Sequence, residues 1–78
     1  MIRVLLFAEL SEKTGKQELV IDRKEMTVTD LKEVLILQHD ELAPLDRVMV
    51  AVNEEYAEED ATVKEGDTVA LIPPVSGG

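Results

Sequence analysis

The sequence predicts a two-layer α+β domain, in which one main helix lies across one face of a mixed β-sheet. Segments rich in β-branched and large apolar residues lie on both sides of one stretch with helical apolar spacing. Turn residues, mainly glycine and asparagine, separate these segments. The 78 residues predict a single small domain, because no internal repeat or linker divides them.

The chain opens with two predicted strands joined by a short helical turn. Residues 2–8 are almost continuously apolar and form the first strand, and residues 17–22 alternate and form the second. A helical turn is expected at residues 9–14, and Gly15 can end it in the left-handed conformation. The two strands are therefore expected to pair with each other.

The main helix is predicted to begin with Thr29 as its N-cap residue. Asp30 then lies in the first turn, where the helix dipole favours an anion. Leu31 and Leu35 follow at helical spacing, and the pattern ends at residues 38–40. This helix is the only long one that the sequence predicts.

Three further strands follow the helix, and they are expected at residues 48–52, 55–57 and 68–72. Asn53 and Glu54 make a turn between the first two, because asparagine tolerates a positive φ. Residues 64–67 make another turn, and Pro73 ends the last strand because it has no N–H for the ladder. The most apolar strands, the first and the last, are expected to be central neighbours. The order β-β-α-β-β-β describes a β-grasp, ubiquitin-like domain over residues 1–72, followed by a flexible C-terminal tail, 73–78.

One helix covers one face of the sheet, so the other face is predicted to be open. Because side chains alternate along a strand, the residues that share a face with Arg3 are assigned to this open face. The apolar residues assigned to it are Leu5, Phe7, Met49, Ala51, Ala70 and Ile72. A clustered apolar patch on a small domain marks a binding surface. The alternatives are an assignment wrong by one residue, or coverage by the early helical turn.

The charge of the chain argues against nucleic acid as a partner. The net charge is −9, and residues 40–78 carry −8 of it, with ten acidic and two basic side chains. Such a surface repels phosphate backbones, which argues against nucleic acid and leaves a basic protein partner or simple solubility. The short apolar start suits neither a signal peptide nor a membrane span. The absence of cysteine fits the cytoplasm.

The side chains predict neither a metal site nor an active site. His39 is the single histidine, and without cysteine a transition metal has too few ligands. The acidic run at 54–60 lacks the spacing of a calcium loop. Ser11 and Ser76 have no base at a suggestive spacing, so no catalytic triad can be assembled. The chain by itself is expected not to be an enzyme, and it is expected to bind no cofactor stably.

The tail, PPVSGG, offers a different reactive group, the terminal carboxylate of Gly78. A carboxylate becomes an acyl donor once it is converted to a mixed anhydride with a nucleotide phosphate. Gly77 and Gly78 lack Cβ and can enter a narrow channel in another protein. Pro73 and Pro74 favour polyproline II, in which six residues reach roughly 19 Å. The alternative is an ordinary frayed end.

The chain resembles the small, sulfur-carrier subunit of molybdopterin synthase, the MoaD family, in the ubiquitin-like group that includes the thiamine carrier ThiS. The segments VLLFAEL, AVNEEY and KEGDTVALIPPVSGG carry this resemblance. It implies that a ubiquitin-activating-like adenylyltransferase uses ATP to adenylate Gly78, which becomes a thiocarboxylate. It also implies that two such subunits flank a dimer of the large catalytic subunit. The sulfur then goes to a cyclic pterin monophosphate, forming the dithiolene of molybdopterin.

The resemblance also implies which residues meet the large subunit. The residues that enter its active site with Gly78 would be Pro73, Pro74, Val75, Ser76 and Gly77. Phe7 and Ile72, together with Leu5 from the open face, would form the docking patch. Tyr56 matches a docking position too, although alternation assigns it to no face. The chain departs from the family in an acidic segment at 57–61 and a short helix.

Three other functions stay open on the residues. A thiamine-type sulfur carrier would have the same kind of chain end. A protein modifier would join Gly78 to a lysine of its target, and the tail suits this equally. A plain acidic binding module would use the patch and leave the tail idle.

Overall fold

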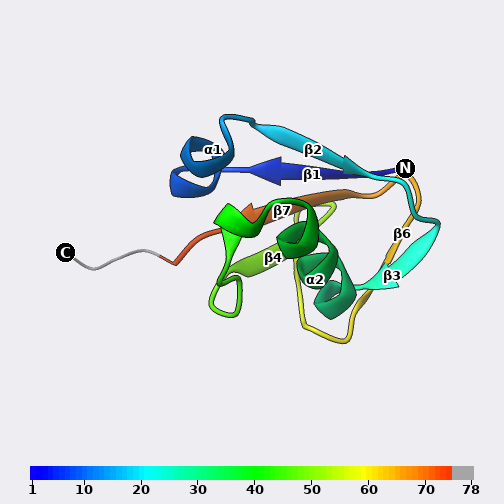
Figure 1. The fold of residues 1–78 in the computed structure, drawn as a ribbon. Coiled ribbons are helices and arrows are strands. Elements are labelled where there is room, and N and C mark those ends of the chain that lie inside the picture. The colour runs from blue at the N-terminus through cyan, green and yellow to red at the C-terminus, as the bar shows by residue number, and fades with distance from the viewer. Residues whose placement is uncertain (75–78) are drawn as a thin grey trace.

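The computed structural model describes residues 1–74, which form a mixed sheet packed against a helix (Figure 1). Within this range the main sheet has five strands in the order β2-β1-β7-β4-β5. The strands are β1 (Ile2–Leu6), β2 (Glu18–Ile21), β4 (Met49–Val52), β5 (Glu55–Ala57) and β7 (Thr68–Ile72). The helices are α1 (Glu9–Thr14), α2 (Val28–Gln38) and the 3₁₀ helix η1 (Asp40–Leu42). The predicted α+β, ubiquitin-like class is confirmed.

The first and last strands lie at the centre of the sheet, as predicted. β1 and β7 pair in parallel, with Val4 opposite Val69, whereas the other neighbours in the main sheet pair antiparallel. Both strands are largely apolar, with Arg3 and Thr68 as their only polar residues, and a neighbour on each side keeps both away from the sheet edges. β1 ends at Leu6, two residues earlier than predicted, because the chain turns there into α1.

A second, two-stranded sheet was not predicted. It pairs β3 (Glu25–Thr27) antiparallel with β6 (Thr62–Lys64), and Met26 lies opposite Val63 with both side chains buried. Each strand has three residues, so neither is long enough to show alternation in the sequence. The pairing brings together segments more than thirty residues apart.

The predicted N-cap of the main helix is wrong by two residues. Thr27 is the N-cap of α2, and its hydroxyl accepts a hydrogen bond from the Asp30 N–H at 3.1 Å. Thr29 lies within the helix and its hydroxyl donates to the Glu59 carbonyl at 3.0 Å. Both threonines are suitable caps in sequence. Thr27 takes the role because it ends β3 and is already extended, opposite Thr62.

The predicted turns are confirmed. Gly15 follows α1 with φ 72°, and its N–H donates to the Ser11 carbonyl. Asn53 and Glu54 both have positive φ, 51° and 71°, which gives the tight two-residue hairpin between β4 and β5. The 64–67 turn contains Gly66 at φ 91°.

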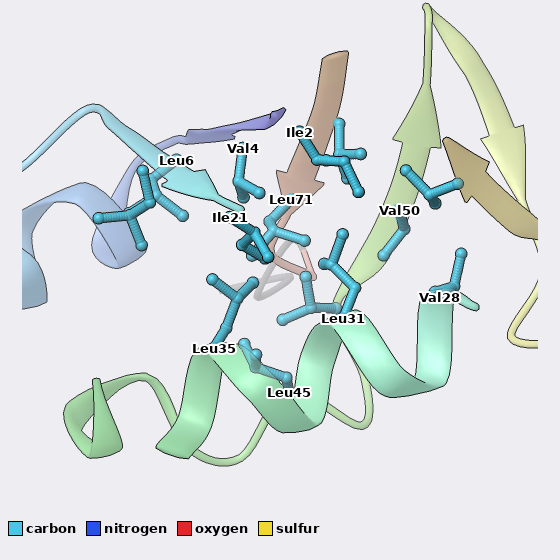
Figure 2. Packing of buried hydrophobic residues seen from close by; sticks show 14 of the residues in the cluster. Ile2, Val4, Leu6, Ile21, Val28, Leu31, Leu35, Leu45, Val50 and Leu71 are labelled. Atoms are coloured by element: carbon cyan, nitrogen blue, oxygen red, sulfur yellow. The ribbon is translucent and has the colours of Figure 1, made fainter. Parts of the chain in front are cut away.

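The core lies between the main sheet and α2 (Figure 2). Ile2, Val4 and Leu6 point from β1 into the core. Leu31 and Leu35 of α2 point into the same core. Fully burying one such side chain stabilises the fold by roughly 1.5–3 kcal/mol. The remaining core side chains include Leu10, Ile21, Val28, Leu42, Leu45, Val50 and Leu71. The face of the sheet that α2 covers is therefore the one the alternation predicted.

Candidate functional site

The opposite face of the main sheet carries one continuous row of side chains across its five described strands. Residues paired across neighbouring strands place their side chains on the same face. The registers give the row Glu18, Leu5, Ala70, Ala51 and Tyr56. The row joins residues from β2, β1, β7, β4 and β5 in that order, so the open face spans the whole sheet.

A second group of apolar residues lies at the end of the sheet where β7 stops. Ile72, the last residue of β7, pairs with Met49 of β4. Leu6 pairs with Leu71 in the parallel β1–β7 register, so Phe7 and Ile72 both come next at the same end of the sheet. The register therefore places Phe7 and Ile72 near the point where the predicted tail begins.

Most of the predicted open-face residues are accessible. Phe7 is 48% exposed and Met49 is 51% exposed, while Leu5, Ala70 and Ile72 are half-buried. The helical turn α1 therefore leaves Phe7 accessible. Ala51 lies on this face as predicted, but it is only 8% exposed and adds little accessible surface. Its methyl group is short and lies between the cross-strand neighbours Ala70 and Tyr56.

Tyr56, which alternation could not assign, belongs to the open face. It pairs with Ala51, so its side chain lies on the same side of the sheet, and it is 70% exposed. A three-residue strand is too short to show a period, so its register against β4 was needed to place it. The docking patch predicted from the sequence, defined as Leu5, Phe7, Tyr56 and Ile72, thus comes from three strands and the residue after β1.

One ion pair lies on the open face. The Arg3 guanidinium donates to the Glu18 carboxylate at 2.7 Å, and this hydrogen bond holds the pKa of Glu18 below its usual value. A hollow of about 460 Å³ lies beside Phe7, between the end of β1, α1 and the start of β2, and Ala8, Gln17 and Glu18 help to line it. The patch therefore offers apolar surface with a cavity next to its aromatic ring.

The root of the tail lies between α1 and the loop that precedes β4. Pro73 is half-buried and Pro74 is exposed, and Pro74 borders a hollow shared with Leu10, Lys13 and Arg47. Figure 1 shows the chain leaving the body of the domain at this end. The predicted site residues Val75, Ser76, Gly77 and Gly78 lie outside the described residues.

Residues 1–74 contain no group of three or more histidine, cysteine or acidic side chains that could hold a metal ion. Among the same residues, no helix has the length and apolar character needed to cross a membrane. His39 ends α2, where its backbone N–H donates to the Leu35 carbonyl at 2.7 Å. The described chemistry is therefore that of an apolar surface beside a chain end.

Comparison with known proteins finds relatives that are named as sulfur carriers and as modifiers. The ThiS family matches residues 4–78. The molybdopterin synthase sulfur carrier subunit of Arabidopsis thaliana is 38% identical, over 99% of this chain and 82% of that protein. The crystal structure of SAMP1 from Haloferax volcanii is similar with a TM-score of 0.83 and 32% identity, covering 99% of this chain and 98% of that one.

A complex shows the same fold in an assembly. The complex of subunits 1 and 2 of the molybdopterin-converting factor from Helicobacter pylori contains a chain that matches with a TM-score of 0.71. The match covers 99% of this chain and 97% of that chain, at 23% identity. At this identity the likeness shows the fold alone.

Proposed function

The chain belongs to the ThiS family, and from this we propose that it is the sulfur-carrier subunit of a molybdopterin synthase. Relatives that match nearly its whole length carry that name. The observation that carries the proposal is the position of the docking patch, whose Phe7 and Ile72 lie at the end of the open face where the tail begins. One partner can thus hold the patch and receive the tail.

The reactive atom in this proposal is the carbonyl carbon of Gly78. A ubiquitin-activating-like enzyme joins the Gly78 carboxylate to the α-phosphate of ATP, and pyrophosphate leaves. A sulfur nucleophile then attacks the acyl carbon and AMP leaves, so that a thiocarboxylate forms. This group stays anionic at neutral pH and is a better nucleophile than a carboxylate. ATP is consumed by the activating enzyme and is not a resident cofactor of this chain.

The large subunit supplies the catalytic site in this proposal. The tail, Pro73 to Gly78, enters that site, and basic groups there bind the thiocarboxylate. Sulfur then passes to a cyclic pterin monophosphate, where it forms the dithiolene of molybdopterin. The glycines fit because a residue without Cβ needs the least room in a channel. The body of the domain serves to hold the tail in place.

Intact-mass spectrometry tests the sulfur-carrier proposal. The chain is incubated with its activating enzyme, ATP and a sulfur source, and we expect one oxygen to be replaced by sulfur at Gly78. A variant that lacks Gly78 is the matched control and should stay unchanged. An unchanged mass in the wild-type chain, with an activating enzyme shown to be active on another carrier, contradicts the proposal.

A second function, a protein modifier, is favoured by one observation. SAMP1, a small archaeal modifier protein, is 32% identical to this chain over nearly its whole length. In that case Gly78 would form an amide with a lysine of a target. Higher-mass conjugates in cell extract that disappear when Gly78 is deleted would support it, whereas sulfur transfer without conjugates supports the carrier.

A further inference from the structure

The strand β5 forms an edge of the main sheet. The pattern of its hydrogen bonds to β4 leaves the backbone N–H and C=O of Tyr56 on the edge side. A two-residue turn closes the β4–β5 hairpin, so Val52 and Glu55 form the hydrogen-bonded pair next to the turn. The next pair, Ala51 and Tyr56, is then a non-hydrogen-bonded pair. The backbone N–H and C=O of Tyr56 therefore point away from β4, in the plane of the sheet, toward its unpaired edge.

The two edges of the main sheet differ in charge. The edge strand β2 and its flanks, residues 16–25, carry three basic side chains (Lys16, Arg23 and Lys24) balanced by three acidic ones, and lysine at an edge commonly prevents unwanted strand pairing. Residues 48–63, which contain β5, have five acidic side chains and no basic one. The β5 edge thus repels acidic chains, including much of a second copy of this one, and attracts basic ones.

A hollow of about 340 Å³ lies beside this edge, where the chain leaves β5 and separates from the start of β4. Met49 and Tyr56 of the open face line it, together with Glu58. Lys32, only 7% exposed, also lines it, and its ammonium is 3.0 Å from the Glu59 carboxylate. Its charge is therefore already paired. The remaining charged side chains are Asp46 and Arg47, so the lining keeps a net negative charge.

We propose that the β5 edge accepts a short, extended, basic segment of the partner as an added strand. The inference rests on the proposed function, since the partner is the large subunit that docks on the open face. Tyr56 would donate one main-chain hydrogen bond and accept another, as in other strand additions. Basic side chains of the segment would lie near Glu55 and Glu58. The edge contact continues the docking patch, because Tyr56 belongs to both.

Two variants at position 56 distinguish the contribution of the backbone N–H to binding from that of the aromatic ring. Tyr56→Val and Tyr56→Pro both lose the aromatic ring, but only proline also loses the outward N–H. Proline is tolerated at an edge strand when its missing N–H faced solvent, so the ladder to β4 stays intact. We expect Tyr56→Pro to bind the large subunit about three- to tenfold more weakly than Tyr56→Val, the worth of one backbone hydrogen bond. Calorimetric titration of the purified subunits measures this ratio.

Hydrogen exchange on the unaltered chain gives a second measurement, which holds even where Tyr56→Pro folds poorly. The Tyr56 amide should exchange freely in the isolated chain and become protected in the complex. Equal affinities of the two variants in well-folded proteins, or an unprotected Tyr56 amide in the complex, overturn the added strand and leave the sulfur-carrier function standing. No binding of the wild-type chain overturns both.

Charge variants test the basic character of the segment. Glu58→Gln should slow association with the large subunit severalfold at low salt and reduce its salt dependence, whereas Asp22→Gln beside β2 should change neither. Equal effects at the two edges contradict a basic segment at β5. The other candidate for the edge is a second copy of this chain, and sedimentation of the isolated chain measures its oligomeric state. A dimer that Tyr56→Pro abolishes would assign the edge to the second copy and overturn the proposal.

Discussion

The two faces of the main sheet are built from the same strands, but one is buried and the other is partly exposed. Leu6 and Phe7 are neighbours in the chain, yet Leu6 is 3% exposed in the core and Phe7 is about half exposed. Both are large and apolar, so hydrophobicity alone does not separate them. The position of α2 does, because one helix can cover only one side. Apolar residues on the uncovered side contribute less to folding and are available to a partner.

The largest expected effect comes from placing the same charge on each face in turn, at the neighbouring positions 6 and 7. Leu6→Asp places a carboxylate in the core and should cost more than about 4 kcal/mol of unfolding free energy, most of the stability of a small domain. Phe7→Asp should change that free energy by less than about 1 kcal/mol. It should nevertheless abolish binding to the large subunit. Urea unfolding and calorimetric binding measure the two effects, and similar unfolding curves for the two variants would contradict the assignment of faces.

A middle-sized effect tests the helix that covers the core face. Thr27→Ala removes the N-cap hydroxyl of α2 and should lower the unfolding free energy by about 1 kcal/mol, with binding through the open face unchanged. Thr29→Ala is the matched control, because it removes a hydroxyl two residues away that bonds only to the exposed Glu59 carbonyl. The reverse order of the two losses in thermal or urea unfolding would restore Thr29 as the cap.

The smallest effect concerns the turn between β6 and β7, at the opposite end of β7 from Ile72. Hydrogen bonds from the Lys64 N–H, at 2.8 Å, and from the Asn53 amide, at 3.0 Å, hold the pKa of Asp67 below its usual value. A lowered folded-state pKa stabilises the fold above the unfolded pKa, and this stabilisation is lost as pH falls through the folded pKa. The unfolding free energy should therefore fall modestly between about pH 5 and pH 2.

Asp67→Asn keeps the shape of the side chain and removes its charge, so it should flatten part of this pH dependence. Glu18→Gln is the comparison on the open face, because the Arg3 hydrogen bond also lowers the pKa of Glu18. That pair is exposed and screened by solvent, so Glu18→Gln should flatten the curve less. Unfolding curves at a series of pH values decide the order, and a larger effect for Glu18 would contradict it.

Much of the site could be predicted because alternation along a strand is a local property. The period of two along the first and last strands assigned Leu5, Phe7 and Ile72 to the open face. The registers agree for Leu5 and Ile72, and Phe7 is about half exposed. The same rule failed to show that Ala51 is buried, since its burial depends on the neighbouring strands. Tyr56 could be placed only once its partner on β4 was known. The roles proposed for residues 75–78 stay predictions.

The net charge, the lack of thiolate ligands, the turn glycines and the alternating strands follow from the order of residues along the chain. The chemical character of the PPVSGG segment follows from it too. The cap at Thr27, the β3–β6 pair and the acidic open edge at Tyr56 could be read only from the folded chain. Each of these depends on the register between segments far apart in sequence. Register is set by the summed energies of many contacts across the fold, and no short stretch of residues contains that information.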